Sequence, residues 1–446
     1  MEVTSIFFIL LVLISSLIYY GIKPHYRVLF LLLISAGFIV SYRGFYLIYI
    51  LLFTIFNYFI GLLIDKQPDK KLIFWIGIIV NIMQLILFRY TDLFIKNTND
   101  LFKAELLLVP LGISFYTLQG IGYLINIKKG WEKPEIRFTH FCLFIIFYPK
   151  FLSGPIERSN RLLPQLTPLP AFSEKNIVNG MKLLILGAFQ KAFIANQLYN
   201  LLDGFRNNLA LLSGTETLIM IFSLPLVLYF DFAGYTNIAL GISKVYGFEL
   251  SPNFDKPFLA QTVSQFWRKF HMSLSYWFND YIYKQVSFKL RKLGNLASAI
   301  AVFCSFLLFG VWHGSGINFI LIGLMQSLAI NYEFFTKRFR IKHFNKYDPY
   351  LGRILTYSFY SITLILFFFQ SIKDVGLVYR NVSNTYNLTF RFLDFKILLY
   401  LTIGFIILLL YKKIRNNLII ESLFLVLMLV IIFSFSNSSA FIYQNF

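Results

Sequence analysis

The sequence predicts an all-α protein that crosses a membrane many times. Of its 446 residues, 57% are hydrophobic and 14% are charged, and the mean hydropathy is +0.66. A soluble domain usually has about 25% charged residues. A water-facing globule of this length cannot bury so much apolar surface, so we interpret the chain as a polytopic membrane protein.

Apolar runs close to the length that a helix needs to cross the hydrocarbon core recur along the chain. One crossing takes about 20 residues, and several runs are shorter, so we expect about 11–13 membrane segments that include re-entrant or interfacial helices. The run that ends in Tyr148-Pro149-Lys150 is a re-entrant candidate. The candidate segments are 3–20, 27–42, 44–64, 72–90, 106–127, 137–153, 178–202, 214–232, 295–312, 316–335, 352–372, 395–411 and 417–436.

The net charge of +20 gathers in short loops between these runs. An excess of Lys and Arg marks cytoplasmic loops, so we attribute most of the charge to topology and expect no nucleic-acid partner. The rest of the positive charge is also consistent with a basic vestibule that attracts a phosphorylated or acidic donor. Placing 21–27, 65–71 and 128–137 inside puts the N-terminus, 91–105 and 373–394 outside. The other basic loops are 284–292, 337–346 and 412–415.

We expect one membrane domain that spans 1–446, because no internal repeat, low-complexity tail or Pro/Gly-rich linker divides the chain. The apolar run 3–20 is too long for the core of a typical signal peptide and is interpreted as the first membrane helix. Cys142 and Cys304 lie far apart within apolar stretches. Their positions predict neither a disulfide framework nor a metal site.

Three stretches place polar residues inside the apolar body, where function is usually found. In 147–166, Gly154-Pro155 breaks the backbone before Glu157, which is typical either of a covered re-entrant segment or of an ordinary loop. We interpret 230–258 as scaffold, in which Asp231 caps a helix or pairs with a cation. The stretch 265–286 predicts an amphipathic helix that lies across the interface or dips into the protein, with Arg268, His271 and Ser275 on one face.

His271 and His313 differ from the other histidines, because each lies in a polar and aromatic setting within the hydrophobic body. Trp267 and Trp312 are close to them in sequence. A buried histidine is often only a hydrogen-bonded packing residue, but a neutral imidazole can also take a proton from a hydroxyl and return it to a leaving group. The three remaining histidines, for which a loop or interfacial position is expected, are His25, His140 and His343.

The residues around these histidines leave two chemical alternatives. A metal would need a cluster of further His, Cys or carboxylate ligands, and the sequence has none, so we expect no metal. Intramembrane histidines also serve proton relays in transporters. General acid–base catalysis and proton-coupled transport therefore both fit the pattern.

Several motifs in order resemble the membrane-bound O-acyltransferase family, over about 105–335. "FWRKFHMSLSYWFNDYIY" (266–283) and "GVWHGSGINFILIGL" (310–324) resemble its two histidine motifs. "PLGISFYTLQGIGYLINIKKG" (110–130), "FYPKFLSGPIERSNRLLPQL" (147–166) and "YFDFAGYTNIALGISKVYGF" (229–248) are similar to its bacterial branch of alginate and peptidoglycan O-acetyltransferases. The D-alanyl transferase of teichoic acid alanylation is a near cousin.

The resemblance implies a bundle of tilted helices around a central tunnel, with His313 as the catalytic histidine and His271 assisting it. It also implies a donor thioester, acetyl-CoA or an acyl-carrier protein, at the cytoplasmic face of a bacterial cytoplasmic membrane. The acyl group would pass to a hydroxyl of an envelope polysaccharide or of an extracytoplasmic partner protein. Candidate substrate-binding residues are Trp267, Arg268, Asp280 and Trp312.

Departures from the family pattern affect the choice of acyl group. Asn279 stands where the alginate-type pattern usually has Arg, Phe270 stands where it has Trp, and "KQVSFKLRK" replaces the expected Pro-Leu-Gly-Gly step. "HMSLS" favours D-alanyl transfer, whereas "GPIERSNRLLPQL" and "WHGSGINFILIGL" favour acetyl transfer. We expect acetyl transfer. The alternatives outside this chemistry are a transporter or flippase of an envelope polymer and a non-catalytic scaffold of a secretion complex.

Overall fold

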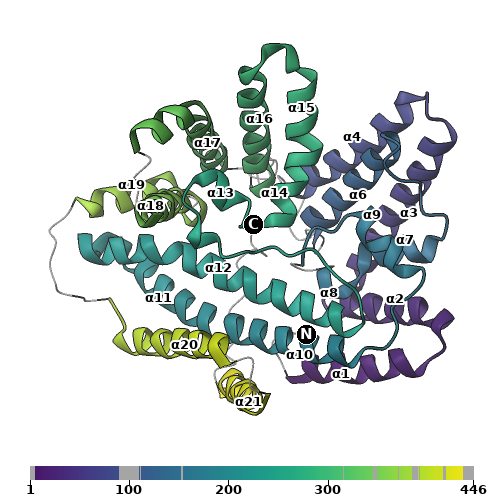
Figure 1. Ribbon diagram of the computed structural model, residues 1–446, viewed down its shortest axis with the longest axis horizontal. Helices are drawn as coiled ribbons and strands as arrows, with labels where there is room; N and C mark the ends of the chain where they lie inside the picture. The colour runs from purple at the N-terminus through teal and green to yellow at the C-terminus, as the bar shows by residue number, and fades with distance from the viewer. Residues whose placement is uncertain are drawn as a thin grey trace, which may run out of the picture. The chain divides into compact units, whose positions relative to one another are not determined.

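The computed structural model describes residues 6–89, 110, 112–151, 154–314, 316–344, 349–369, 371–383, 390, 392–414 and 418–434. Within these residues the regular structure is helical, apart from one isolated antiparallel β-bridge between Phe254 and Phe270. The predicted all-α class is confirmed (Figure 1). The loop 91–105, parts of the basic loops 337–346 and 412–415, part of 373–394, and the side chain of His343 lie outside the described residues.

Seven helices in the described part of the chain are long and apolar enough to cross a membrane. Four shorter apolar helices lie near the ends of the chain, and outward-facing side chains such as Leu17 leave an apolar surface for lipid. The multi-pass prediction is therefore confirmed. The long helices cover Gly44–Lys66, Lys71–Phe88, Glu174–Asn207, Gly214–Val245, Asn295–His313, Ile317–Arg340 and Tyr350–Phe368, and the shorter ones Phe7–Gly21, Pro24–Val40, Phe395–Tyr411 and Ile419–Ser434.

The expected segment 137–153 does not form one continuous helix. Helix α7 (Phe138–Ile146) ends at Phe147, and α8 (Tyr148–Phe151) is only four residues long. Pro149 has no N–H to donate to the carbonyl of Ile145, and its ring would clash with that carbonyl in a continuous helix. The break agrees with the prediction that this stretch is not a simple span.

The chain forms two compact units, and each consists of two separate stretches of sequence. Unit 1 comprises Met1–Leu184 and Thr236–Pro252, and unit 2 comprises Ile185–Tyr235 and Asn253–Phe446. Helices α10 (Glu174–Phe189) and α12 (Gly214–Val245) each contribute residues to both units. The other helices of unit 1 are α1 (Ile6–Gly21), α2 (Pro24–Val40), α3 (Gly44–Lys66), α4 (Lys71–Arg89), α6 (Ile113–Lys128), α7, α8 and α9 (Ser159–Leu162).

Amide side chains join three helices of unit 1. Asn81 on α4 donates to Asn57 on α3 over 2.9 Å, and Gln84 on α4 donates to Thr117 on α6 over 3.2 Å. Between apolar helices in a membrane, such bonds add to van der Waals packing as a source of association. This unit also holds the predicted break at Gly154-Pro155, where the buried Glu157 accepts hydrogen bonds from the backbone and hydroxyl of Ser251.

Unit 2 contains both histidines singled out by the sequence. Its π-helical stretches cover Gln190–Ala195 and Asn279–Tyr283. Its α-helices, in addition to its parts of α10 and α12, are α11 (Asn196–Asn207), α13 (Val263–Trp267), α14 (Met272–Phe278), α15 (Lys284–Lys289), α16 (Asn295–His313), α17 (Ile317–Phe344), α18 (Pro349–Phe368), α19 (Ile372–Val382), α20 (Phe395–Ile414) and α21 (Leu418–Ser434).

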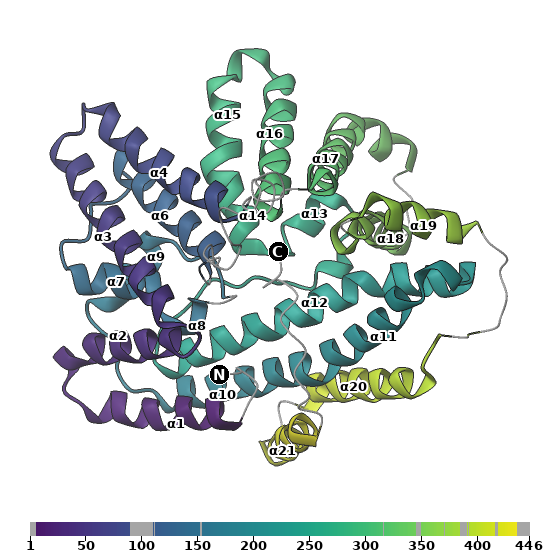
Figure 2. The ribbon, with the colours of Figure 1, turned by 180° about the vertical axis from the view of Figure 1, so that it is seen from behind.

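Helices α16 and α17 pack closely because glycines face the partner backbone. A Cβ atom on Gly310 would lie 2.2 Å from the carbonyl oxygen of Phe319, and one on Gly323 would lie 2.3 Å from that of Phe306. Small residues of this kind let membrane helices approach at backbone distance. Within the same unit α15 stands beside α16, and α13 and α18 pack against α17 (Figures 1 and 2). This packing places the C-terminal end of α16, and with it His313, in the core of unit 2.

Candidate active site

The helix expected over 265–286 is interrupted at the first histidine, so this prediction is wrong in detail. Helix α13 ends at Trp267, and α14 begins at Met272. Between them the chain pairs with an extended segment, because Asp255 N donates to Lys269 O over 3.0 Å and Met272 N donates to Asn253 O over 2.9 Å. These long-range bonds take the place of helical ones, and Arg268, His271 and Ser275 consequently do not share one helix face.

His271 sits at this break in the left-handed backbone region, with φ 47° and ψ 52°. Left-handed non-glycine residues are uncommon and cluster at functional sites, where the surrounding structure over-determines them. The His271 side chain is 1% exposed, and its ring meets Phe232 edge to face with centroids 4.6 Å apart. Burial lowers the pKa of His271 from 6.5 to about 3. The imidazole is therefore neutral at neutral pH.

His313 is the last residue of α16 and is also buried, at 3% exposure. Its ring lies against three aromatic rings, with centroids 4.4 Å from Phe309, 4.7 Å from Trp312 and 5.6 Å from Phe367. The ring centroids of Trp312 and His271 also lie 6.5 Å apart. The fold thus brings both predicted histidines to one aromatic cluster, with Trp312 in contact with each.

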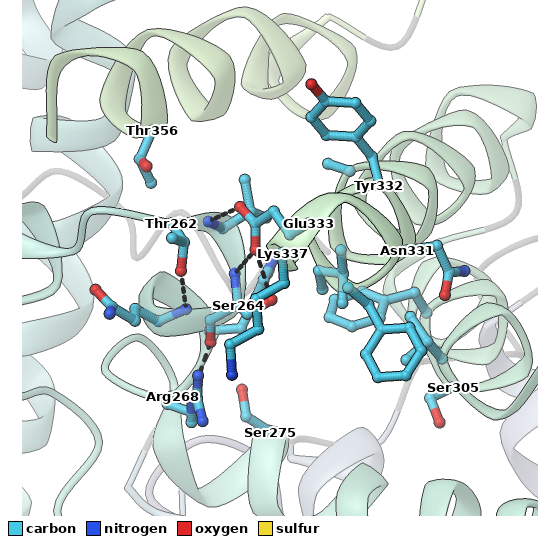
Figure 3. A pocket seen from close by; sticks show the side chains of 18 of the residues that line it. Thr262, Ser264, Arg268, Ser275, Ser305, Asn331, Tyr332, Glu333, Lys337 and Thr356 are labelled. Atoms are coloured by element: carbon cyan, nitrogen blue, oxygen red, sulfur yellow. Dashed lines mark hydrogen bonds between the residues drawn. The ribbon is translucent and has the colours of Figure 1, made fainter. Parts of the chain in front are cut away.

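A large cavity of about 1210 Å³ lies within unit 2 (Figure 3). Its polar wall is basic, with Arg268, Lys337 and Arg340 among the lining residues. The one carboxylate among the described lining residues, Glu333, is already engaged, since it accepts from Val263 N over 2.6 Å and from Ser264 N over 3.0 Å at the start of α13. The excess of positive charge in the cavity suits an anionic ligand.

A second cavity of about 20 Å³ borders His313. Its wall is almost entirely apolar and aromatic, and no acidic side chain lines it in the part of the chain that the structure describes. Among the described residues, Trp267 and Phe309 are the two that line both cavities. These two residues are therefore common to the walls of the basic cavity and of the cavity that borders the histidine.

Residues 135–372 match the model of MBOAT, the membrane-bound O-acyltransferase family. The chain belongs to this family. It is an O-acyltransferase, as the family name states, and the resemblance found in its histidine motifs is confirmed.

Three relatives of this membrane-bound O-acyltransferase cover most of its chain. It is 29% identical to the peptidoglycan O-acetyltransferase of Helicobacter pylori, over 81% of this chain and 75% of that protein. It is 30% identical to the probable alginate O-acetylase of Pseudomonas aeruginosa, over 71% of this chain and 62% of that protein. It is 28% identical to the teichoic acid D-alanyltransferase of Bacillus subtilis, over 71% of this chain and 83% of that protein.

The candidate substrate-binding residues of the O-acyltransferase fall in different places. Trp267 lines both cavities, Arg268 lines the basic one, and Trp312 touches both histidines. Asp280 lies in the π-helical stretch after α14, where its carboxylate accepts from Lys284 over 2.7 Å on the next helical turn. Asp280 is not among the described residues that line either cavity.

Two residues of the site were missed by the sequence analysis. Gln326 on α17 accepts a hydrogen bond from Trp267 Nε1 over 3.0 Å and donates to Thr363 Oγ1 on α18 over 2.9 Å. Both side chains line the small cavity. The sequence does contain a signal for them, because uncharged polar residues in an apolar span mark interhelical contacts or a site. It does not identify the partners of these two side chains.

The scaffold interpretation of Asp231 agrees with its surroundings. Asp231 forms a buried ion pair with Lys191 from the π-helical stretch after α10. The next residue, Phe232, is the ring that packs against His271. The pair thus anchors the part of α12 that supports this histidine.

Proposed function

We propose that this protein transfers an acetyl group from a cytoplasmic thioester across a bacterial cytoplasmic membrane to a hydroxyl of an envelope polysaccharide or of an extracytoplasmic partner protein. The observation that carries the proposal is that His313 borders a small apolar cavity whose wall shares Trp267 and Phe309 with a large basic cavity. Reactants held in one site react far faster than free ones. The lipid-shielded site also limits hydrolysis.

In this mechanism the hydroxyl oxygen attacks the thioester carbonyl carbon while His313 takes the hydroxyl proton. The new C–O bond forms, the C–S bond breaks, and the imidazolium returns its proton to the departing thiolate. A neutral His271 has one ring N–H to donate and one ring nitrogen to accept a bond. It would orient the acceptor hydroxyl or stabilise the oxyanion that develops on the carbonyl oxygen.

The basic cavity fits the donor side of this reaction. Coenzyme A and the phosphopantetheine arm of a carrier protein both carry phosphate, which Arg268, Lys337 and Arg340 would attract. Lys337 and Arg340 belong to the basic C-terminal end of α17, and His313 lies near its opposite end, at Ile317. The topology expected from the basic loops places the C-terminal end of α17 inside.

The small cavity favours acetyl over D-alanyl as the transferred group. A D-alanyl ester carries an ammonium group, and burying a cation is costly unless it is paired. The described wall of the small cavity has no carboxylate to pair with it.

Reconstitution in liposomes tests the proposal. Acetyl-CoA labelled in the acetyl group is enclosed inside, and label is measured on a glycan or partner protein outside. We expect transfer by the native protein and a decrease of about 10²–10⁴-fold for His313→Gln, the usual contribution of general acid–base catalysis. The exposed His25→Gln is the matched control and should retain full transfer.

Three results would contradict the acetyl proposal. If only carrier-bound D-alanine supports transfer, the acyl group is D-alanyl. If His313→Gln in cells abolishes polymer export as well as the ester, loss of the ester does not identify His313 as the base of the transfer. If the variant changes neither, His313 is not the catalytic base.

A further inference from the structure

Two aromatic residues are shared by the walls of the basic cavity and of the small cavity at His313. Trp267 and Phe309 line both cavities, and their ring centroids lie 4.8 Å apart in a T-shaped contact. We call this pair of rings the partition. A passage between the basic cavity and His313 along this wall must go past these rings. Any group that enters from the basic cavity therefore meets Trp267 before it meets His313.

The space on the His313 side is too small for a reactant in this conformation. A cavity of about 20 Å³ is close to the volume that holds one water molecule, for which about 10–15 Å³ suffices. An acetyl thioester consists of several heavy atoms and needs a larger volume than one water molecule. We call this conformation, in which the small cavity does not admit a reactant, the closed conformation.

A chain of buried hydrogen bonds holds the indole in the closed position. Trp267 Nε1 donates to Gln326 Oε1 over 3.0 Å, Gln326 Nε2 donates to Thr363 Oγ1 over 2.9 Å, and Thr363 Oγ1 donates to the carbonyl of Tyr360 over 2.9 Å. Gln326 is 1% exposed and Trp267 is 7% exposed. A buried indole N–H that loses its acceptor is destabilised, so Gln326 biases Trp267 toward closure.

We propose that Gln326 is a positioning residue that latches the Trp267 indole across the passage between the basic cavity and His313, and that this latch limits which acyl groups reach the histidine. The part concerning acyl groups rests on the proposed transfer function. The part concerning the partition does not, because it predicts physical access to the small cavity.

Cysteine accessibility tests the partition without any enzymatic readout. The native Cys142 and Cys304 are first replaced with Ala. Ile322→Cys then places a thiol on the wall of the small cavity, and Tyr276→Cys places one on the wall of the large cavity, where Tyr276 is 45% exposed. The probe is the anionic reagent 2-sulfonatoethyl methanethiosulfonate, and the measurement is the modification rate of each thiol.

We call the hydrogen bond between Gln326 and Trp267 the latch. While the latch is intact, we expect Ile322→Cys to react at least about tenfold more slowly than Tyr276→Cys. Gln326→Leu and Trp267→Ala should each accelerate modification of Ile322→Cys about tenfold or more, since a lost constraint of 1.4 kcal/mol corresponds to a factor of 10. Gln326→Glu, which keeps an acceptor for the indole, should preserve the slow rate. An unchanged rate at Tyr276→Cys shows that a latch variant is folded.

Two results would overturn the partition. One is that Ile322→Cys is modified as fast as Tyr276→Cys in the protein that keeps the native Gln326 and Trp267. The other is an Ile322→Cys rate that neither Gln326→Leu nor Trp267→Ala changes although the Tyr276→Cys rate is normal.

Acyl selectivity supplies a second readout in the liposome assay. Trp267→Ala should raise the use of propionyl-CoA relative to acetyl-CoA several-fold, because one methylene is commonly worth about 10-fold or more in a tight apolar site. An unchanged ratio would contradict the role of the latch in selectivity. If the native protein transfers no acetyl group, the proposed function fails, while the cysteine rates still decide the partition.

Discussion

At the scale of single residues, burial sets the protonation state of His271. His271 is held at φ 47° between two short helices, with the ring of Phe232 against it. Low solvent access disfavours the imidazolium form, and the pKa of His271 falls to about 3. A ring in that state can donate one hydrogen bond and accept another throughout the neutral pH range.

The lowered pKa of His271 predicts a pH-dependent stability. Between pH of about 3 and about 6.5 the unfolded chain binds a proton at this position and the folded chain does not. Stability rises with pH wherever the unfolded state binds more protons, so the free energy of unfolding should decrease as pH falls from about 6.5 toward 3. We expect a lower unfolding temperature at pH 5 than at pH 7.5 in detergent.

The His271→Gln variant should lose part of this decrease, because glutamine does not titrate. The exposed His25→Gln is the control and should keep the native pH dependence. Differential scanning fluorimetry at the two pH values measures both. Equal decreases in the native protein and in His271→Gln would show that other groups cause the acid sensitivity.

At the scale of elements, the site depends on close helix packing and on one broken helix. The α16 and α17 backbones approach at Gly310 and Gly323, and Gly310 lies one turn before His313. The start of α13 is fastened to α17 by Glu333, whose carboxylate accepts two backbone N–H groups. The helix dipole favours such an acid at a helix N-terminus, so this contact positions Trp267 at the other end of α13.

A methyl group at Gly310 should separate α16 from α17. In Gly310→Ala the new Cβ would lie 2.2 Å from the Phe319 carbonyl oxygen, a backbone atom that cannot rotate away. Overpacking typically costs about 1–3 kcal/mol, and we expect both a lower unfolding temperature and reduced transfer. Gly376→Ala on α19 is the matched control, because no described atom beyond the local backbone of its own helix lies within 4 Å of the position that its methyl group would take, and alanine favours a helix. Equal stability of the two variants would contradict close α16–α17 packing.

At the scale of the whole molecule, charge and hydropathy set the orientation in the membrane. The net charge of +20 resides largely in short loops, and such loops stay in the cytoplasm. The basic loop 128–137 is accordingly expected inside, and the stretch 373–394 outside. Lys133 and Lys373 are both exposed in the structure and serve as reporters of the two sides.

Single-cysteine labelling measures this orientation. In a chain without Cys142 and Cys304, a membrane-impermeant maleimide added to intact spheroplasts should label Lys373→Cys and not Lys133→Cys. Permeabilisation should make the two sites react alike, since both positions are exposed. The reverse pattern in intact spheroplasts would invert the predicted topology.

The sequence by itself determined the class of the protein, its multiple spans and its family. Hydropathy predicts most of the membrane helices, because a chain in lipid must satisfy its backbone hydrogen bonds locally as helix, but it does not predict where the run 137–153 is broken. The motifs around His271 and His313 likewise carried the family, which the match over 135–372 confirmed. The assignment of His313 as base and His271 as its assistant stays a prediction.

Tertiary structure alone decided how the site is built. The local pattern of 265–286 favours one continuous helix, but pairing of 253–255 with 269–272 breaks that helix at His271. In the same way Gln326 and Trp267 are 59 residues apart, and only the packing of α13 on α17 joins them. Local propensity cannot reveal such arrangements, because their free energy comes from contacts between segments that are distant in sequence.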